Sequence, residues 1–232
     1  MTNVAVIPAR SGSKRIPHKN IIVIDDRPLI AHVIDMIRQT QLFDEIVVST
    51  DSEEIMEIVT DLGATAPFFR PPNLSDDFAK TIDVLRHATN ELSLNDFDNV
   101  CCIYPTAIMT QPDSLCASLT RLTSSSAQFC MPITKFQSHP LRGFSFSEDA
   151  FSITPFFPEN TETRTQDIAP MFFDAGQYYW AKAKAWRESD SVHRNAIGFE
   201  VPWWQAIDLD EPEDLEKLKF AYQYFIKGKY HG

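Results

Sequence analysis

Short apolar runs alternate with helical patterns along the first half of this 232-residue chain. Residues 4–8 form a run typical of a buried strand, and the segment 28–39 places Leu29, Val33 and Ile37 on one face of a helix. Buried strands separated by helices favour a mostly parallel sheet with helices on both faces, so we predict an α/β fold. Further strands are expected at 45–49, 100–104 and 129–133, and further helices at 52–62, 81–92 and after Pro112.

The alternation is interrupted between residues 134 and 170. This segment is rich in Phe, Pro, Ser and Thr and has no sustained helical period, so we interpret it as an inserted lobe of short strands and loops. Strands are expected again at 178–181, 198–201 and 206–209, followed by a helix from about Pro212, all within one domain over 1–232. The aromatic rings of the lobe are expected either to cover a dimer contact or to form a minor core; they belong to Phe144, Phe146, Phe151, Phe156 and Phe157.

Composition excludes several classes of function. With a net charge of −11, the chain lacks the basic face that phosphate backbones reward, so nucleic-acid binding is not expected. No window approaches the roughly 18 to 20 apolar residues of a spanning helix, and the first residues do not resemble a signal peptide. We expect a cytoplasmic protein without a membrane partner, whose four cysteines are reduced and mostly buried rather than metal-binding.

Residues 8–20, here called the basic loop, reverse the charge of the chain locally. No acidic residue precedes Asp25, whereas four Lys and Arg side chains fall between positions 10 and 19. In a doubly wound sheet, the loop after an early strand opens at the carboxyl edge, where ligands bind. Its Ser-Gly-Ser stretch lets the backbone approach a ligand and offers N–H donors to phosphate. The alternative is a solvated loop that only offsets acidic neighbours; neither a Walker loop nor GxGxxG is present.

Two aspartates stand two positions apart near the end of the chain. If 206–209 is a strand, Asp208 and Asp210 project from the same face, where their hard oxygen donors suit Mg²⁺, with Mn²⁺ as the second choice. In the alternative interpretation, Asp210 caps the following helix and Glu213 completes a capping box. On the residues alone, both interpretations stay open.

The basic loop and the residue before it, IPARSGSKRIPHKN at 7–20, closely resemble the IPARxGSKxIPxKN signature of the CMP-sialic acid synthetase family. Similar segments follow in order: VVSTD at 47–51, FRP at 69–71 with LSDD at 74–77, and YPT at 104–106. The resemblance covers nearly the whole chain. It implies a Rossmann-like nucleotidyltransferase fold, a homodimer, and transfer of CMP from CTP to an acidic nine-carbon sugar for bacterial surface glycans.

The resemblance also implies a set of site residues. The CTP molecule would be bound by Pro8, Ala9, Arg10, Ser11, Gly12, Ser13, Lys14, Lys19 and Arg70. The sugar, in part through the inserted lobe, would contact Tyr104, Arg164, Gln166, Asp174 and Gln177. Metal binding is implied for Asp208 and Asp210, which form the expected catalytic set together with Arg10 and Lys19.

The sugar end departs from the sialic acid enzymes. Tyr104 replaces the glutamine usual before the PT motif, and Asp174 replaces the asparagine of a PNG-like turn. With FFDAGQYYW at 172–180, these residues resemble the pseudaminic acid branch of the family, with N-acetylneuraminate and legionaminate as alternative sugars. A non-catalytic nucleotide-binding module is the remaining alternative. No general base is identified, although His18 is a candidate because histidine titrates near neutral pH.

Overall fold

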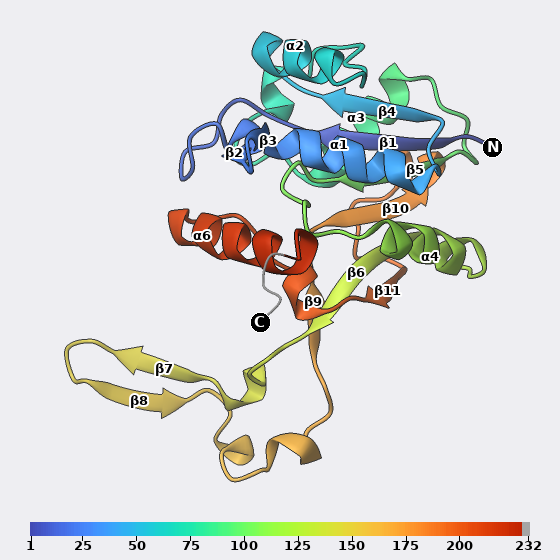
Figure 1. The fold of residues 1–232 in the computed structure, drawn as a ribbon. Helices are drawn as coiled ribbons and strands as arrows, with labels where there is room; N and C mark the ends of the chain where they lie inside the picture. The colour runs from blue at the N-terminus through green and yellow to red at the C-terminus, as the bar shows by residue number, and fades with distance from the viewer. Residues whose placement is uncertain (229–232) are drawn as a thin grey trace.

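The structure is a computed structural model that describes residues 1–228, and a seven-stranded sheet forms its centre (Figure 1). The strands lie in the order β11-β6-β10-β5-β1-β4, and β9 pairs with β6 outside this row. Strand β1 pairs in parallel with β4 and β5, and β6 pairs in parallel with β11. The bounds are β1 Asn3–Pro8, β4 Glu45–Ser49, β5 Asn99–Ile103, β6 Phe129–Lys135, β9 Phe172–Asp174, β10 Tyr178–Lys182 and β11 Ala196–Glu200.

Strands β9 and β10 run against the others. Because β10 pairs antiparallel with both β5 and β6, these two strands share one direction. Five of the seven strands (β4, β1, β5, β6 and β11) therefore run the same way. The prediction of a mostly parallel sheet is confirmed, but the sequence pattern does not predict the reversal of β10 within it.

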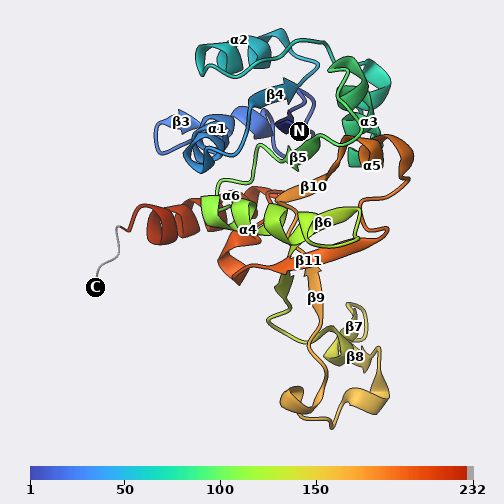
Figure 2. The same cartoon turned by 90° about the vertical axis from the view of Figure 1, so that its right-hand side faces the viewer.

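Helices cover both faces of the sheet, as the apolar strands predict (Figures 1 and 2). Along β1, Ala5 and Ile7 belong to one core with residues of α1, α4 and α6. The alternate residues Val4 and Val6 belong to a second core with residues of α3 and α5. The helix bounds are α1 Leu29–Thr40, α2 Glu53–Asp61, α3 Thr81–Glu91, α4 Pro112–Thr123, α5 Ala183–Glu188 and α6 Pro212–Ala221.

The prediction of a strand at 206–209 is wrong. These residues follow the 3-10 turn η6 Trp203–Gln205 and reach α6 without pairing with another strand of the described chain. Leu209 is fully buried in the same core as Leu218 of α6, and Ile207 packs against this core as well, so these alternating apolar residues resemble a strand. Two short elements are also not predicted by the apolar pattern. They are α5 and a hairpin of β2 Val23–Ile24 with β3 Arg27–Pro28.

The inserted lobe projects from the body of the protein (Figures 1 and 2). It begins at the end of β6 and contains an antiparallel hairpin of β7 Phe144–Ser147 and β8 Ser152–Pro155. The five phenylalanines between 144 and 157 are 39% to 85% exposed, so the interpretation that they form a minor core is wrong. The remaining lobe elements are the 3-10 turns η3 Pro140–Arg142, η4 Pro158–Asn160 and η5 Thr165–Asp167.

The cysteines and the helices bear on two further expectations. Cys101, Cys102 and Cys130 are buried, and they and Cys116 are all free, which confirms the prediction of unpaired, mostly buried thiols. Burial raises the pKa of the Cys130 thiol to about 11, so this thiol stays protonated at neutral pH. Within residues 1–228, no helix has the length and apolar character needed to cross a membrane.

Asp98 ties together the amino ends of the neighbouring strands β1 and β5. Its Oδ1 accepts a hydrogen bond from the N–H of Thr2 at 2.9 Å, and its Oδ2 accepts one from the N–H of Asn95 at 2.9 Å. These bonds, the Thr2 bond most strongly, stabilise the carboxylate and hold the pKa of Asp98 below its ordinary value. Strands β1 and β5, which lead to the candidate site, are therefore fixed where they begin.

We expect Asp98→Asn to lower the free energy of unfolding by about 1 to 2 kcal/mol at pH 7. Because the folded-state pKa is depressed, this contribution is present above the unfolded pKa of about 3.9 and is lost as pH falls through the lower folded value. Urea unfolding at pH 7 and at about pH 2.5 measures the difference. Asp190→Asn, which removes an exposed carboxylate paired with Arg194, is the control. An equal effect of Asp98→Asn at both pH values contradicts this account.

Candidate active site

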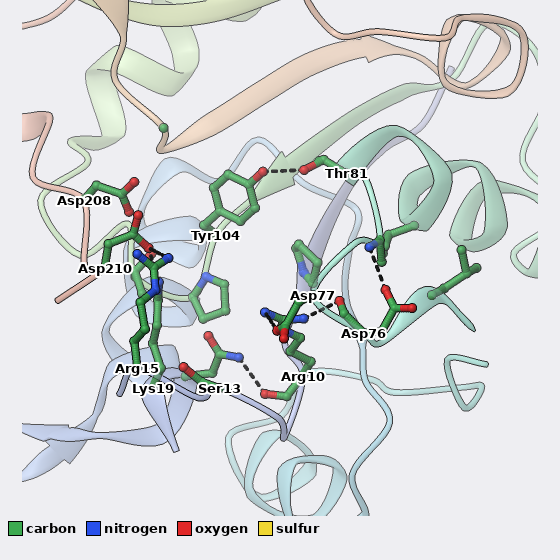
Figure 3. Close-up of a pocket in the computed structure, with 18 of the residues that line it drawn as sticks. Arg10, Ser13, Arg15, Lys19, Asp76, Asp77, Thr81, Tyr104, Asp208 and Asp210 are labelled. Carbon is green, nitrogen blue, oxygen red and sulfur yellow. Dashed lines mark hydrogen bonds and ion pairs between the residues drawn. The ribbon is translucent and has the colours of Figure 1, made fainter. Parts of the chain in front are cut away.

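A cavity of about 600 Å³ opens where β1 and β5 end (Figure 3). Its wall is formed by the basic loop, residues 70–84, the turn after β5, the turn into β10, and the segment 206–210. Ligands of doubly wound sheets bind beyond the carboxyl ends of parallel strands, and that position is hollow in this chain. The charged side chains of the wall are Arg10, Lys14, Arg15, Lys19, Arg70, Asp76, Asp77, Asp208 and Asp210.

Local contacts fold the basic loop back against the sheet. The Asn20 side chain donates to the Arg10 carbonyl at 2.8 Å, and Ile16 is buried beneath the loop. His18 takes a left-handed conformation, with φ of 52°, where the chain turns back. This path brings Arg10 and Lys19 to the cavity (Figure 3). His18, the candidate general base, does not line it.

The structure brings only part of the expected nucleotide set in the basic loop to the cavity. Ala9 is fully buried, and its N–H donates to the carbonyl of Ser49 at 3.0 Å. The N–H and hydroxyl of Ser11 donate to the carboxylate of Asp51 at 2.8 and 3.1 Å, and exposed Gly12 is also off the wall. The expected nucleotide-binding residues of the basic loop that do line the wall are Pro8, Arg10, Ser13, Lys14 and Lys19.

Arg70 is a buried cation on the cavity wall. Only 4% of the residue is exposed, and its Nε donates to the Ser75 hydroxyl at 3.2 Å. Its Nη2 has no hydrogen-bond partner in the part of the chain that the structure describes. Loss of water around the guanidinium lowers the pKa of Arg70 to about 10, so the side chain stays charged at neutral pH. A buried charge with an unused donor is unfavourable unless a ligand supplies the acceptor.

Asp208 and Asp210 both reach the cavity, although they do not lie on a strand. Asp210 forms ion pairs with Arg15 at 2.9 Å and with Lys19 at 3.3 Å. Asp208 is accessible but recessed in the cleft, and the loss of surrounding water together with the charge of Asp210 raises the pKa of Asp208.

These two carboxylates fit a divalent cation. Asp208 forms no ion pair within residues 1–228, so a bound cation would supply the charge that it lacks. Mg²⁺ takes one or two carboxylates and completes its shell with phosphate oxygens and water. A larger cluster, with three or more His, Cys, Asp or Glu side chains placed to hold a metal, does not occur among residues 1–228. Two carboxylates alone would leave most positions around such an ion for other ligands.

The interpretation of Asp210 as a helix cap is wrong. The N-cap of α6 is Glu211, and Asp214 rather than Glu213 completes the capping box. The Asp214 carboxylate accepts hydrogen bonds from the N–H of Glu211 at 2.8 Å and from the N–H of Asp210 at 3.2 Å. Because the cap lies one residue later than expected, the carboxylate of Asp210 is left to pair with the basic loop.

Two tyrosines, Tyr104 and Tyr179, form part of the wall, and Tyr104 lies on the side of Asp208 (Figure 3). The hydroxyl of Tyr104 forms a hydrogen bond of 2.5 Å with the hydroxyl of Thr81, the first residue of α3. The rings of Tyr104 and Tyr179 meet edge to face, with their centroids 5.9 Å apart. Burial raises the pKa of both tyrosines well above the ordinary value, so both are neutral polar groups.

Asp174 and Gln177 support the wall without forming part of it. Asp174 accepts hydrogen bonds from the hydroxyl of Tyr179 at 2.7 Å and from the N–H of Gly176 at 2.8 Å. Gly176 lines the cavity with φ of 63°, a conformation that favours glycine. Gln177 is 2% exposed, and its side chain donates to the carbonyl of Ile207 at 3.3 Å. Both side chains can therefore act on a ligand only through the residues that they hold.

Arg164 and Gln166 lie on the inserted lobe and do not line this cavity. Both are exposed, and Arg164 pairs with Asp167 at 3.1 Å. The wall instead contains residues for which the sequence indicates no role. Some of them belong to the LSDD and YPT segments, which gave no sign of which side chain faces the cavity. The polar residues of the wall for which the sequence indicates no role include Asn20, Asp76, Asp77, Thr81, Thr106 and Tyr179.

We expect Arg70→Leu to raise the melting temperature of the ligand-free protein by about 2 to 4 °C, the shift that about 1 kcal/mol produces at this chain length. The substitution removes a buried charge whose Nη2 has no partner in the described chain. Arg86→Leu is the control and should lower the melting temperature, because three guanidinium nitrogens of Arg86 donate to acceptors. Differential scanning calorimetry measures both. A lower melting temperature for Arg70→Leu contradicts the view that its charge is unsatisfied.

Known proteins are similar in sequence to this chain over most of its length. Residues 4–148, more than half of the chain, match the family model described as cytidylyltransferase. A pseudaminic acid cytidylyltransferase of Campylobacter jejuni subsp. jejuni serotype O:2 is 36% identical over 226 residues, which cover 96% of this chain and 97% of that protein. A CMP-N,N'-diacetyllegionaminic acid synthase of Legionella pneumophila subsp. pneumophila is 30% identical and covers 94% of this chain and 96% of its own length.

The fold is also found among solved structures. The structure of CMP:2-keto-3-deoxy-manno-octonic acid synthetase complexed with CTP superimposes with a TM-score of 0.72 at 18% identity, covering 97% of this chain and 99% of that one. At this identity the likeness concerns the fold, and it confirms the predicted nucleotidyltransferase architecture. The family model and the full-length relatives go further, and they show that this chain belongs to the cytidylyltransferase family.

Proposed function

We propose that this chain transfers CMP from CTP to pseudaminic acid and releases pyrophosphate. The observation that carries the proposal is the buried guanidinium of Arg70, with an unused donor, on the wall of a cavity that also holds the basic loop and two aspartates. The full-length similarity to a pseudaminic acid cytidylyltransferase supports this choice of substrates. We place the reaction in the cytoplasm, where CTP is available.

Arg70 is proposed to bind the base. Cytosine presents two neighbouring acceptors, O2 and N3, whereas uracil presents an N3–H donor in place of the second acceptor. A guanidinium carries donors only, so it pairs with both cytosine atoms but meets a second donor on uracil. Because Arg70 is buried, water cannot replace the missing acceptor, and the mismatch is costly.

The basic loop is proposed to bind the triphosphate through Arg10, Lys14 and Lys19, which form charge-assisted hydrogen bonds with phosphate oxygens. Asp208 and Asp210 would hold Mg²⁺, or Mn²⁺ in its place. When bound, this ion offsets the charge of the triphosphate and polarises the phosphorus that is attacked. Lys19, which contacts Asp210 at 3.3 Å, lies where it can stabilise both the carboxylate and the phosphates.

The sugar is proposed to lie against Tyr104 and Tyr179, the neutral polar part of the wall beside Asp208. Asp174 would act by fixing the hydroxyl of Tyr179. The anomeric hydroxyl of the sugar then attacks the α-phosphorus of CTP in line, and pyrophosphate leaves. The protein contributes position and charge stabilisation, the latter from Arg10 and Lys19, rather than covalent chemistry.

We expect Mg²⁺-dependent release of pyrophosphate from CTP and pseudaminic acid, with kcat/KM about ten- to a hundredfold lower for UTP, because uracil leaves a donor of Arg70 unpaired. A coupled pyrophosphate assay should compare CTP, UTP, ATP and GTP, each with pseudaminic acid, N-acetylneuraminate and legionaminate. Asp208→Asn should abolish the dependence on Mg²⁺ together with most of the turnover.

Two outcomes of this assay contradict different parts of the proposal. Preferred turnover of N-acetylneuraminate or legionaminate would replace the sugar and leave the nucleotide unchanged. No Mg²⁺-dependent release of pyrophosphate with any of the sugars would favour a non-catalytic module that only binds nucleotide.

The sugar site is proposed to be completed by a second copy of the chain. Arg164 and Gln166 are exposed on the inserted lobe, which projects from the body, so they can serve a sugar only if the lobe reaches another subunit (Figures 1 and 2). A two-stranded hairpin is marginally stable alone, and exposed apolar patches mark surfaces that partners cover. Phe146 and Phe156 are 60% and 65% exposed on this lobe. We therefore propose a homodimer in which each lobe covers its partner.

Sedimentation velocity is expected to show a particle with twice the 26.4 kDa mass of the chain. The double variant Phe146→Ser, Phe156→Ser should shift the population to monomers and lower turnover, because it removes apolar contacts of the lobe. Phe97→Ser is the control, since Phe97 is 70% exposed but lies outside the lobe. A fully active monomer of the natural sequence contradicts the proposed dimer.

A further inference from the structure

The cations of the basic loop are already paired in the ligand-free chain. Arg10 contacts Asp77 Oδ1 at 3.0 Å, and Lys14 contacts Asp77 Oδ2 at 2.7 Å. One carboxylate thus engages both cations, one oxygen on each (Figure 3 shows the contact with Arg10). On the other side of the loop, Arg15 and Lys19 pair with Asp210. Every cation of the loop therefore already has a carboxylate partner within the protein.

The segment 72–79, here called the strap, fixes the position of Asp77. The guanidinium of Arg10 also donates to the carbonyl oxygens of Ser75 and Asp76. The Asp76 carboxylate accepts hydrogen bonds from the N–H groups of Phe78 and Ala79 at 2.9 and 2.8 Å, which shapes the turn around Asp77. Because the backbone on both sides of Asp77 is held, its contact with the two cations is a built feature of the fold.

Asp77 offers these cations what a phosphate would offer. Carboxylate and phosphate oxygens are interchangeable as acceptors of charge-assisted hydrogen bonds from Arg and Lys. The hydrogen bond from Lys14 lowers the pKa of Asp77 below its ordinary value, so the carboxylate is charged at neutral pH. An incoming phosphate must therefore displace Asp77 from Arg10 and Lys14 or accept weakened contacts beside a like charge.

We propose that Asp77 is a built-in competitor of phosphate that lowers the affinity of the cavity for pyrophosphate. The identity of pyrophosphate as the product rests on the proposed function, but the competition itself requires only a polyphosphate anion. Under that function, Asp77 returns to Arg10 and Lys14 as pyrophosphate leaves and limits its rebinding. Asp77 is thus a residue that tunes product release rather than a ligand contact.

Isothermal titration calorimetry with inorganic pyrophosphate, in the presence of EDTA, tests this competition without a metal or a sugar. We expect Asp77→Asn and Asp77→Ala to bind pyrophosphate about three- to tenfold more tightly than the natural chain, the range that two exposed ion pairs allow. Asp35→Asn is the matched control. Asp35 is 36% exposed, as Asp77 is, and it also pairs with two arginines, Arg27 and Arg38, but it does not line the cavity. The affinity of the Asp35→Asn variant for pyrophosphate should equal that of the natural chain.

A gain in affinity cannot result from damage to the fold, so tighter binding in both Asp77 variants, with Asp35→Asn unchanged, supports the proposal. Unchanged or weaker binding in Asp77→Asn and Asp77→Ala overturns it, as does an equal gain in Asp35→Asn. Turnover of CTP and pseudaminic acid by the natural chain is measured separately. If turnover is absent but the Asp77 variants bind pyrophosphate more tightly, the proposed function fails and the competition stands.

Discussion

Strand β1 pairs in parallel with β4 on one side and with β5 on the other, and the candidate site depends on this arrangement. Parallel pairing brings the carboxyl ends of three strands to one edge. The basic loop and the turn with Tyr104 start there, and the N–H of Arg70 donates to the carbonyl of Thr50 just beyond β4 at 2.7 Å. A sheet buried on both faces therefore supplies a rigid frame, and loops of little regular structure can carry the charges.

Two charged groups of the site, Arg70 and Asp208, have unfavourable surroundings in the ligand-free chain, and their charges are opposite in sign. Burial lowers the pKa of Arg70, whereas loss of surrounding water and then the charge of Asp210 raise the pKa of Asp208. One group lacks an acceptor and the other lacks a cation. In the proposed function, a nucleotide bound with a divalent ion would provide both, whereas neither component alone would. These two unsatisfied groups agree with the proposed binding of a nucleotide together with a divalent ion, and such sites lower the stability of the empty protein.

Apolar periodicity predicted most of the body, because each central strand and long helix buries a regular face. It failed at residues 206–209, where Ile207 and Leu209 contact the core at alternate positions without belonging to a strand. The direction of β10 was not predictable, since local apolarity is the same for parallel and antiparallel strands. The loop motif located the cavity but not the side chains that face it. Ser11 turns to Asp51, and Asp174 supports Tyr179, through contacts between residues distant in sequence or across a turn.

We propose that the cavity at the ends of β1 and β5 binds the nucleotide, with the buried guanidinium of Arg70 on its base. A crystal structure of the chain with CTP and Mg²⁺ tests this most directly. We expect cytosine within about 3.2 Å of a guanidinium nitrogen of Arg70 and the triphosphate among the cations of the basic loop. CTP bound elsewhere, or bound in the cavity with the base away from Arg70, would contradict this proposal.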